Sequence, residues 1–494
     1  MKRSKEKTAL RRIRSVAKHK KTALDLSALG LTSLPSEIGE LSHLKELYLD
    51  DNYLETLPEA FANLKNLKDL SLIGNPFIEF PLVISQLSSL ETLSLYETNL
   101  SKLPPEIGQL TQLIDLEISG NPLSYLPDEI GQLVNLTHLV VNDCVLKTLP
   151  HTLGNLQHLQ QLSIVNNSLE ALPKSIGRLA QLTHLEIASN QLTLLPDTIG
   201  GLSQLTRLCL MGNPIKALPS SIGKLSSLQS LELADTACKK LPPEIGQLTQ
   251  LTNADFGNNR LSSLPASMKE LKNLSRLILN HNPLKEFPEA IRGCKSLNCL
   301  WMNNASIKSI PAWIGELDKL SILDVSCNRI QSIPAEIGNC TALEKIYVGA
   351  NRIQEIPSTI GQLSKLTVLA IGSNKLEAIP PEIGQLKELE HVFWGDNNIR
   401  SLPDEIGNLK KLHSLSLPSN QLKSLPESLG KLSSLVSLTL YGNKLSSLPQ
   451  SLQKLKKLRL LHLRENRIKL PNRLYDKTAK DQLAYIFKSD KDIE

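Results

Sequence analysis

Hydrophobic residues recur along almost the whole chain in one fixed register. The unit reads L-x-x-L-x-L-x-x-N-x-L-x-x-L-P-x-x-I-G-x-L-x-x, and it returns every 23 residues from Leu29 to Asn466, in twenty copies without insertion or deletion. In the L-x-L segment alternate side chains point to opposite faces of a strand, so the leucines face a core and their neighbours face solvent. Leu-Pro then predicts extended backbone, and Ile-Gly predicts a tight bend with at most a short helical turn.

The period predicts the fold, because a unit of about 20 to 29 residues with this leucine pattern is typical of a leucine-rich repeat solenoid. We expect an α/β solenoid: a leucine-rich repeat horseshoe with a parallel concave sheet of about 20 short strands and a mostly irregular or 3-10 convex side, with helical caps at both ends. Twenty units of 23 account for 460 of the 494 residues. No room remains for a second globular domain.

The two ends differ from the repeats, as a solenoid requires, because terminal sheet edges would otherwise expose core and unpaired backbone. Ile13 and Val16 stand at helical spacing in the first segment, and Leu483 marks a closing helix in the last. The predicted organisation is a basic N-terminal cap helix over 1–21, the twenty-repeat solenoid over 22–471 and a C-terminal cap helix over 472–494. With both caps recognised, we expect the chain to be complete.

A polar position inside each repeat predicts a ladder of buried amides. An asparagine after the strand can satisfy backbone groups in the turn and stack on the asparagine of the next repeat. Thr98, Cys144 and Thr236 can do part of this, but Ala305 cannot, so the backbone near Ala305 should be the least well satisfied unless Asn304 or a water substitutes. The predicted ladder is Asn52, Asn75, Asn121, Asn167, Asn190, Asn213, Asn259, Asn282, Asn328, Asn351, Asn374, Asn397, Asn420, Asn443 and Asn466.

The positions that the leucine scaffold leaves free point to a binding surface. Four residues before the asparagine lies the central column of the predicted concave face, where Trp301, Tyr347 and Phe393 appear in every second repeat. Asp324 stands between two of them, and His391 stands beside Phe393. Neighbouring strands are about 4.8 Å apart, so the rings should stand roughly 10 Å from one another in a line. Exposed Trp and Tyr are favoured anchors of protein interfaces, which predicts a protein-binding strip, although isolated exposed aromatics are also ordinary surface features.

A second zone of the same column is acidic. The acids Glu117, Glu186, Glu232 and Asp255 occupy it, and the adjacent column holds His138, His184 and Arg207. We assign Glu186, Glu232 and Asp255 to the partner-binding face. Two further tryptophans leave the pattern: Trp313 occupies a convex slot, where it would pack on a neighbouring turn or form a second contact, and Trp394 occupies an inward leucine position and should be core.

Charge is segregated along the chain. Residues 1–21 hold ten Lys or Arg against one acid, residues 444–494 hold thirteen against six, and residues 22–443 hold thirty-two against forty-two. The formal net charge of +6 therefore conceals an acidic body with basic ends. A solvated cap helix explains the N-terminal charges best; it would also allow weak contact with an anionic surface through 1–21. No aromatic residue interleaves those charges and no nucleic-acid-binding motif follows them, so we expect no nucleic acid partner.

Composition favours a cytoplasmic protein. No apolar run approaches the ~18 residues of a membrane helix, and no apolar segment with a cleavage site follows the charged start. The seven cysteines are odd in number and lie outside the caps, which suggests free thiols in a reducing compartment.

Sequence motifs for catalysis are absent. The chain has no G-x-x-x-x-G-K-[ST], H-E-x-x-H, G-x-S-x-G or C-x-x-C pattern. Cys294 and Cys299 are five residues apart, but one falls on the convex side and the other on a strand, and no second ligand pair accompanies them. We expect no enzyme activity, no metal and no cofactor.

The repeat also resembles known families. The segments 103–110 and 402–409 read L-P-P-E-I-G-Q-L and L-P-D-E-I-G-N-L, which is similar to the intracellular leucine-rich repeats of Ras-pathway scaffolds of the Shoc type. Plant intracellular Ras-group-related proteins, scribble-type scaffolds, Roco proteins and many bacterial proteins carry a similar unit, and the opening repeat at 23–35 looks like the bacterial and Roco version. The resemblance implies protein binding on the concave face, with a small GTPase or a phosphatase as partner in the Shoc-like case. No GTPase, kinase, PDZ or ubiquitin-ligase module accompanies the repeats.

These patterns lead to one favoured function and two alternatives. The favoured one is a non-catalytic interaction scaffold that binds a protein partner on the concave face, in intracellular signalling. The first alternative is a bacterial effector or surface protein that acts on host proteins. The second is a regulatory subunit of a GTPase or phosphatase complex, or an enzyme, that uses the acidic repeats.

Overall fold

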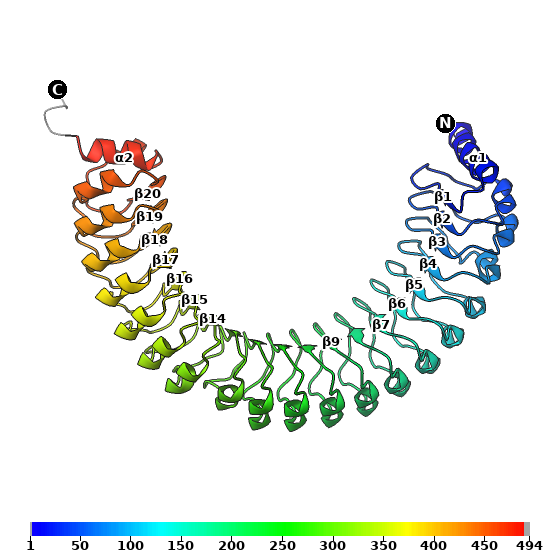
Figure 1. Cartoon of the computed structure of the whole chain (residues 1–494), viewed down its shortest axis with the longest axis horizontal. Coiled ribbons are helices and arrows are strands. Elements are labelled where there is room, and N and C mark those ends of the chain that lie inside the picture. The colour runs from blue at the N-terminus through cyan, green and yellow to red at the C-terminus, as the bar shows by residue number, and fades with distance from the viewer. Residues whose placement is uncertain (1, 489–494) are drawn as a thin grey trace. The chain divides into compact units, whose positions relative to one another are not determined.

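The computed structural model describes residues 2–488 of the chain. Met1 and residues 489–494 lie outside this range, so the outermost part of both predicted caps is not covered. The chain divides into two compact units, Met1–Leu251 and Thr252–Glu494, and each is described by itself. In each unit the strands line one side of the stacked repeats and short 3-10 turns line the other (Figure 1).

The first unit begins with helix α1 (Lys2–His19) and continues with ten three-residue strands. The 3-10 turns η1 to η10 follow these strands at intervals of 23 residues, from Ser36–Glu40 to Pro243–Gln247. The strands are β1 (Ala23–Asp25), β2 (Glu46–Tyr48), β3 (Asp69–Ser71), β4 (Thr92–Ser94), β5 (Asp115–Glu117), β6 (His138–Val140), β7 (Gln161–Ser163), β8 (His184–Glu186), β9 (Arg207–Cys209) and β10 (Ser230–Glu232).

The second unit repeats this order and ends with a helix. Turns η11 (Ala266–Glu270) to η19 (Gln450–Lys454) alternate with its strands, and η20 (Asn472–Leu474) precedes α2 (Ala479–Ile486). The strands are β11 (Asn253–Asp255), β12 (Arg276–Ile278), β13 (Cys299–Trp301), β14 (Ile322–Asp324), β15 (Lys345–Tyr347), β16 (Val368–Ala370), β17 (His391–Phe393), β18 (Ser414–Ser416), β19 (Ser437–Thr439) and β20 (Leu460–His462).

Strand pairing confirms the predicted fold class. Within each unit consecutive strands pair in parallel, and every residue faces the residue 23 positions later, as Leu24 faces Leu47 and Leu369 faces Val392. The middle residue of each strand is buried and its two neighbours point to the other face. We call the sheet surface that these flanking residues form the inner face, and the surface formed by the 3-10 turns the outer face.

The outer face follows from Pro and Gly in each repeat. Each turn from η1 to η19 begins directly after a proline in extended conformation, such as Pro173 with φ −65° and ψ 144° before η7 (Lys174–Arg178). The glycine inside the turn admits the backbone of the next repeat: a Cβ at Gly177 would lie 2.1 Å from the carbonyl oxygen of Thr198. These short turns confirm the prediction of few true helices.

The amide ladder is built as predicted. Asn121 shows its full pattern: Nδ2 donates to the carbonyls of Leu95, Ile118 and Ser119 at 2.7, 2.8 and 3.1 Å. Its Oδ1 accepts from the backbone N–H of Leu100 at 2.9 Å. One side chain thus satisfies backbone groups of two successive repeats, and it is itself 1% exposed.

The expectation of an unsatisfied backbone at Ala305 is wrong. The Ala305 N–H donates to Oδ1 of Asn328 at 2.9 Å. Leu284, whose N–H would need an acceptor at position 305, donates instead to the carbonyl of Asn282 at 2.9 Å. Asn304 does not substitute, because its Nδ2 contacts Nδ1 of His281 at 2.8 Å.

The proline after Asn282 explains why the N–H of Leu284 needs no acceptor from position 305. Pro283 follows Asn282, and its fixed φ closes a three-residue turn that satisfies Leu284 locally. The same local bond occurs before the other three replaced ladder positions, with Phe77 bonding to Asn75, Leu123 to Asn121 and Ile215 to Asn213. Every Asn-Pro of the ladder lies one repeat before a missing asparagine at 98, 144, 236 or 305. The signal for this local bond is present in the sequence, but it lies in the repeat before each missing asparagine.

Restoring the consensus at this gap should therefore not stabilise the protein. We expect Ala305→Asn to lower the free energy of unfolding by about 1 kcal/mol, because the N–H of Leu284 is already used and the new Oδ1 would be buried without a donor. Adding Pro283→Arg should recover most of the loss. Arg329 is the equivalent residue after Asn328, and its N–H donates to the carbonyl of Ile307 in the preceding repeat. Urea unfolding of the two single variants and the double variant measures the coupling; additive effects would contradict the explanation.

The helices at the ends cover apolar surface. In α1 the buried face consists of Ala9, Ile13 and Val16, whereas Ala17 is exposed. Helix α2 is shorter than expected, because Thr478 caps it by accepting from the N–H of Asp481. Its buried residues include Leu483.

Candidate protein-binding surfaces on the inner face

The predicted aromatic column exists as one straight row in the second unit. Trp301 faces Asp324 across β13 and β14, and Asp324 faces Tyr347 across β14 and β15. Tyr347 and Phe393 both face Ala370, on β16 between them. With strands about 4.8 Å apart, the rings stand roughly 10 Å from one another, too far to cover each other. We call Trp301, Asp324, Tyr347, His391 and Phe393 the aromatic strip.

The members of the strip differ in how far they are open to solvent. Phe393 is 44% exposed, whereas Trp301 and Tyr347 are intermediate. The guanidinium of Arg276 lies 4.6 Å from the Trp301 ring centre, an internal cation–π contact that covers part of this ring. The open end of the strip is therefore at Phe393.

His391 and Asp324 orient this surface. The His391 ring stacks on Phe393 at 6.4 Å and 11°, and it lies 6.3 Å from the His413 ring. Asp324 accepts from the N–H of Ser326 at 2.9 Å and from Nδ2 of Asn303 at 3.2 Å. Its carboxylate therefore ties the end of β14 to the neighbouring repeat.

Backbone forms the surface next to the rings. Gly349, Gly372 and Gly395 stand on successive repeats, two residues after the aromatic column. A Cβ at Gly349 would meet the carbonyl oxygen of Gly372 at 3.3 Å, and a Cβ at Gly372 would meet that of Gly395 at the same distance. No side chain from these three positions covers the rings, so the strip borders a low, flat surface.

Comparison with known proteins decides the family. The profile described as Leucine-rich repeat region matches residues 92–169, 124–213, 150–252 and 199–277. The profile described as Leucine rich repeat matches 22–77, 318–376, 364–422 and 410–468. A leucine-rich repeat protein of Leptospira interrogans is 31% identical, with 92% of this chain and 98% of that chain aligned at a TM-score of 0.68. This chain belongs to the leucine-rich repeat family.

Plant receptors are also similar to this leucine-rich repeat protein. The plant peptide hormone receptor RGFR1, solved in complex with RGF2, is 30% identical, covering 90% of this chain and 80% of that one at a TM-score of 0.69. The Arabidopsis receptor kinase HAESA, solved with the peptide hormone IDA and the co-receptor SERK1, is 26% identical. The alignment covers 90% of this chain and 86% of that chain, with a TM-score of 0.60. The search of curated proteins found no match.

The predicted acidic zone divides between an internally paired cluster and a separate residue. In the first unit Arg207 bridges two carboxylates of this leucine-rich repeat sheet, with Nε 3.4 Å from Glu186 and Nη2 3.2 Å from Glu232. Cys209 lies between the two glutamates in the column. Asp255 belongs to the second unit, where it accepts from the N–H of Gly257 at 2.9 Å. Glu186 and Glu232 thus share one internal cation.

The nucleophiles of the repeats are poorly placed for catalysis. Burial raises the pKa of Cys209 and Cys294 to about 11, and that of Cys340 to about 12. These thiols stay protonated near pH 7 and are weak nucleophiles. All seven cysteines, which lie inside the described range, are free. Between residues 2 and 488 no three His, Cys, Asp or Glu side chains gather closely enough to hold a metal ion.

The two predicted exceptions among the tryptophans lie as expected. Trp394 is fully buried, and Trp313 packs against Phe287 with ring centres 5.3 Å apart and planes at 80°. Trp313 therefore supports its own outer turn. The helices of the described residues do not include one that is long and apolar enough to cross a membrane.

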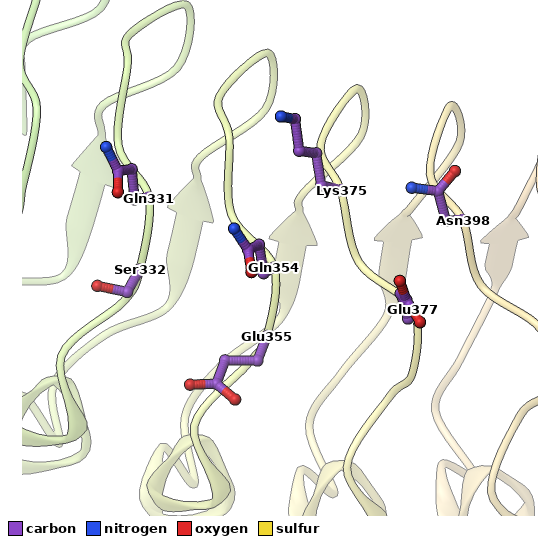
Figure 2. A pocket seen from close by; sticks show the side chains of 7 residues that line it. All are labelled: Gln331, Ser332, Gln354, Glu355, Lys375, Glu377 and Asn398. Atoms are coloured by element: carbon purple, nitrogen blue, oxygen red, sulfur yellow. The ribbon is translucent and has the colours of Figure 1, made fainter.

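A polar hollow on the flank of the second unit was not anticipated (Figure 2). It lies on the segments that follow β14 to β17, and its acid Glu377 is paired with Arg400 at 3.2 Å. Its lining residues are Gln331, Ser332, Gln354, Glu355, Lys375, Glu377 and Asn398. Without an aromatic or apolar anchor, this hollow lacks the central cluster of a protein interface.

The larger omission concerns the acids of the first repeats. Asp115 and Glu117 on β5 line a hollow of the inner face together with Ser94, Tyr96 and Asp143. Asp115 stands six residues before the asparagine position and Asp143 one before it, so neither belongs to the column that holds the aromatic residues. Reading all inner-face columns together would have revealed this concentration of charge.

Proposed function

We propose that this protein is a non-catalytic interaction module that binds a protein partner through the aromatic strip of its second unit. One observation carries the proposal: Trp301, Tyr347 and Phe393 stand in register on an open sheet face, and glycines stand two residues after the second and third of these rings. Rigid aromatic anchors on a preformed sheet bind with little loss of conformational entropy.

Likeness to ligand-binding relatives supports the class of partner. RGFR1 is seen in complex with RGF2, and HAESA with the peptide hormone IDA. An extended segment of a partner protein would suit the straight row of rings in this chain.

A signalling scaffold in the cytoplasm is the setting we propose. The seven free thiols favour a reducing compartment, and the Ras-pathway-like repeat makes a small GTPase or a phosphatase the first class of partner to test. The alternative of a bacterial effector or surface protein draws support from the length-matched likeness to the Leptospira protein. Detection of the chain outside its producing cell would favour that alternative.

Replacing the three rings tests the proposal. We expect Trp301→Ala, Tyr347→Ala and Phe393→Ala together to reduce recovery of the bound protein at least about tenfold, because each interface aromatic contributes on the order of 1–2 kcal/mol. Recovery is measured by affinity capture with the full chain and quantitative mass spectrometry. The far-UV circular dichroism spectrum should remain unchanged, since all three side chains project from the sheet.

A matched control separates lost binding from lost apolar surface. Tyr53, Tyr125 and Leu194 are also large and exposed, with fractions of 62, 49 and 59%, but they lie outside the strands. Their triple alanine variant should recover the partner as the unchanged protein does. Equal recovery by both triple variants would refute the aromatic strip as the binding site.

A further inference from the structure

The inner face of the first unit concentrates carboxylates over β2 to β6. They occupy two of the inner-face columns, six and four residues before the asparagine position, and the loop position just before it. We call this surface the acidic face; its members are Glu46, Asp69, Glu97, Asp115, Glu117 and Asp143.

Within residues 2–488, no lysine or arginine forms an ion pair with the acidic face. From β1 to β8, all within the described residues, the inner-face positions hold no lysine or arginine, and none of the six carboxylates takes part in an ion pair. The contrast with β8 to β10 is direct, because Arg207 there bridges Glu186 and Glu232. The same sheet therefore pairs its acids internally in one region and leaves them open in another.

Ionisation of Asp69 and Asp115 is less favourable in the folded protein than for a carboxyl in water. Burial raises the pKa of Asp69, and a hydrogen bond from the Tyr48 hydroxyl partly lowers it again. The negative charge of Glu46 adds to the rise. Burial also raises the pKa of Asp115, which His138 partly opposes. A cation brought from outside would remove this cost.

The shape of the surface fits basic side chains. In the hollow beside β5, Ile73 and Val140 supply apolar contact, while Asp115, Glu117 and Asp143 supply negative charge. Lysine and arginine side chains match this lining, because their stems are apolar and their ends are positively charged. Tyr96 adds an aromatic ring to the same lining.

We propose that the acidic face docks an extended, lysine- or arginine-rich segment of a partner protein. The open sheet face supplies the area, its charge selects a cationic segment, and the hollow beside β5 receives one basic side chain. Asp69 and Asp115 both flank Thr92 in register, so they lie two strands or roughly 10 Å apart. Successive cations on one side of an extended peptide, about 7 Å apart, can serve both. This surface is independent of the aromatic strip.

Fluorescence anisotropy with the full chain tests the docking. The probe is a labelled alternating lysine-serine peptide long enough to cross four strands, compared with glutamate-serine and glutamine-serine peptides of equal length. We expect binding of the lysine peptide alone, weaker as ionic strength rises. Binding should also weaken as pH falls from near 7 to about 4, because Asp69 and Asp115, whose pKa values are raised by burial, become protonated. Equal binding of the glutamine peptide would overturn the proposal.

Neutralising the central acids should separate binding from stability. Asp69→Asn, Asp115→Asn and Glu117→Gln together should weaken the lysine peptide at least about tenfold. The melting temperature near pH 7 should not fall and is expected to rise. A carboxyl whose folded pKa is raised loses stability as pH rises through that pKa, so the gain should vanish at about pH 3, where both states are protonated. Unchanged affinity would overturn the proposal.

An equal change of charge elsewhere controls for general attraction. Asp128→Asn, Glu170→Gln and Asp197→Asn remove the same charge from exposed positions outside the strands of the same unit. This variant should change affinity by less than about twofold. Equal weakening by both triple variants would mean attraction to net charge alone, and the proposed face would be wrong.

An internal counter-ion gives a second, independent variant. Thr92 faces Asp69 on one side and Asp115 on the other, so Thr92→Arg would place a guanidinium between them, as Arg207 stands between Glu186 and Glu232. We expect a higher melting temperature and loss of lysine-peptide binding. Retained binding by this folded variant would contradict the proposal.

Discussion

Replacing Trp394 by alanine should destabilise the second unit by about 3–5 kcal/mol, the largest single effect we expect in this chain. Trp394 is 0% exposed and heads the fully buried side chains by volume. It occupies a position that leucine fills in most repeats, so its neighbours are arranged around a larger ring. Alanine would leave a cavity that the stacked repeats on both sides prevent from collapsing. Urea unfolding followed by far-UV circular dichroism measures the loss.

Two comparisons show whether burial is the cause. Phe393→Ala changes the neighbouring residue, whose ring projects from the sheet, and should cost less than about 1 kcal/mol. Trp394→Phe should cost clearly less than Trp394→Ala, because it keeps much of the volume and removes an indole Nε1 that has no hydrogen-bond partner. Similar losses for Trp394→Ala and Phe393→Ala would contradict the packing argument.

Replacing Asn121 by alanine should destabilise the first unit by about 3 kcal/mol. The side chain would leave buried carbonyls of Leu95 and Ile118 without one of their donors and the N–H of Leu100 without its acceptor. Thr98 would lose partners as well, because its N–H and Oγ1 both donate to Asn121 Oδ1 at 3.1 Å. Equilibrium unfolding in urea is again the measurement.

An exposed amide of the same repeat family provides the control. Asn135 donates to the carbonyl of Thr111 at 2.9 Å on an exposed part of the surface, and Asn135→Ala should cost less than about 1 kcal/mol. Asn121→Asp would keep the acceptor but lose the donors, so it should remain strongly destabilising. A neutral Asn121→Ala would show that the ladder contributes little to stability.

Much of the fold was predictable because the repeat is local and regular. The buried leucines, the extended prolines and the asparagine ladder each follow from a short segment whose geometry depends on few neighbours. The error at Ala305 shows the limit of reading repeats singly, since Pro283 in the preceding repeat supplies the remedy. Because each turn shares hydrogen bonds with the next, whether a backbone group has a partner depends on two successive repeats.

The candidate sites were less predictable, because equal residues in one column meet different neighbours. Glu186 and Glu117 occupy equivalent positions, yet Arg207 pairs with Glu186, whereas Glu117 takes part in no ion pair with any residue from 2 to 488. Trp301 and Phe393 are also equivalent, but Arg276 covers the first ring and leaves the second open. The neighbours that make the difference come from other columns and other strands, about one repeat or more away in sequence.

By itself, the sequence determined the period, the core positions and the direction of every side chain on the strands, because alternation and a fixed register leave one way to bury the leucines. Only the tertiary structure decided which inner-face residues are free to bind. Pairing of neighbouring strands brings charges and rings from different repeats within a few ångströms, and their mutual contacts determine what remains open. The aromatic strip and the acidic face are defined by those contacts.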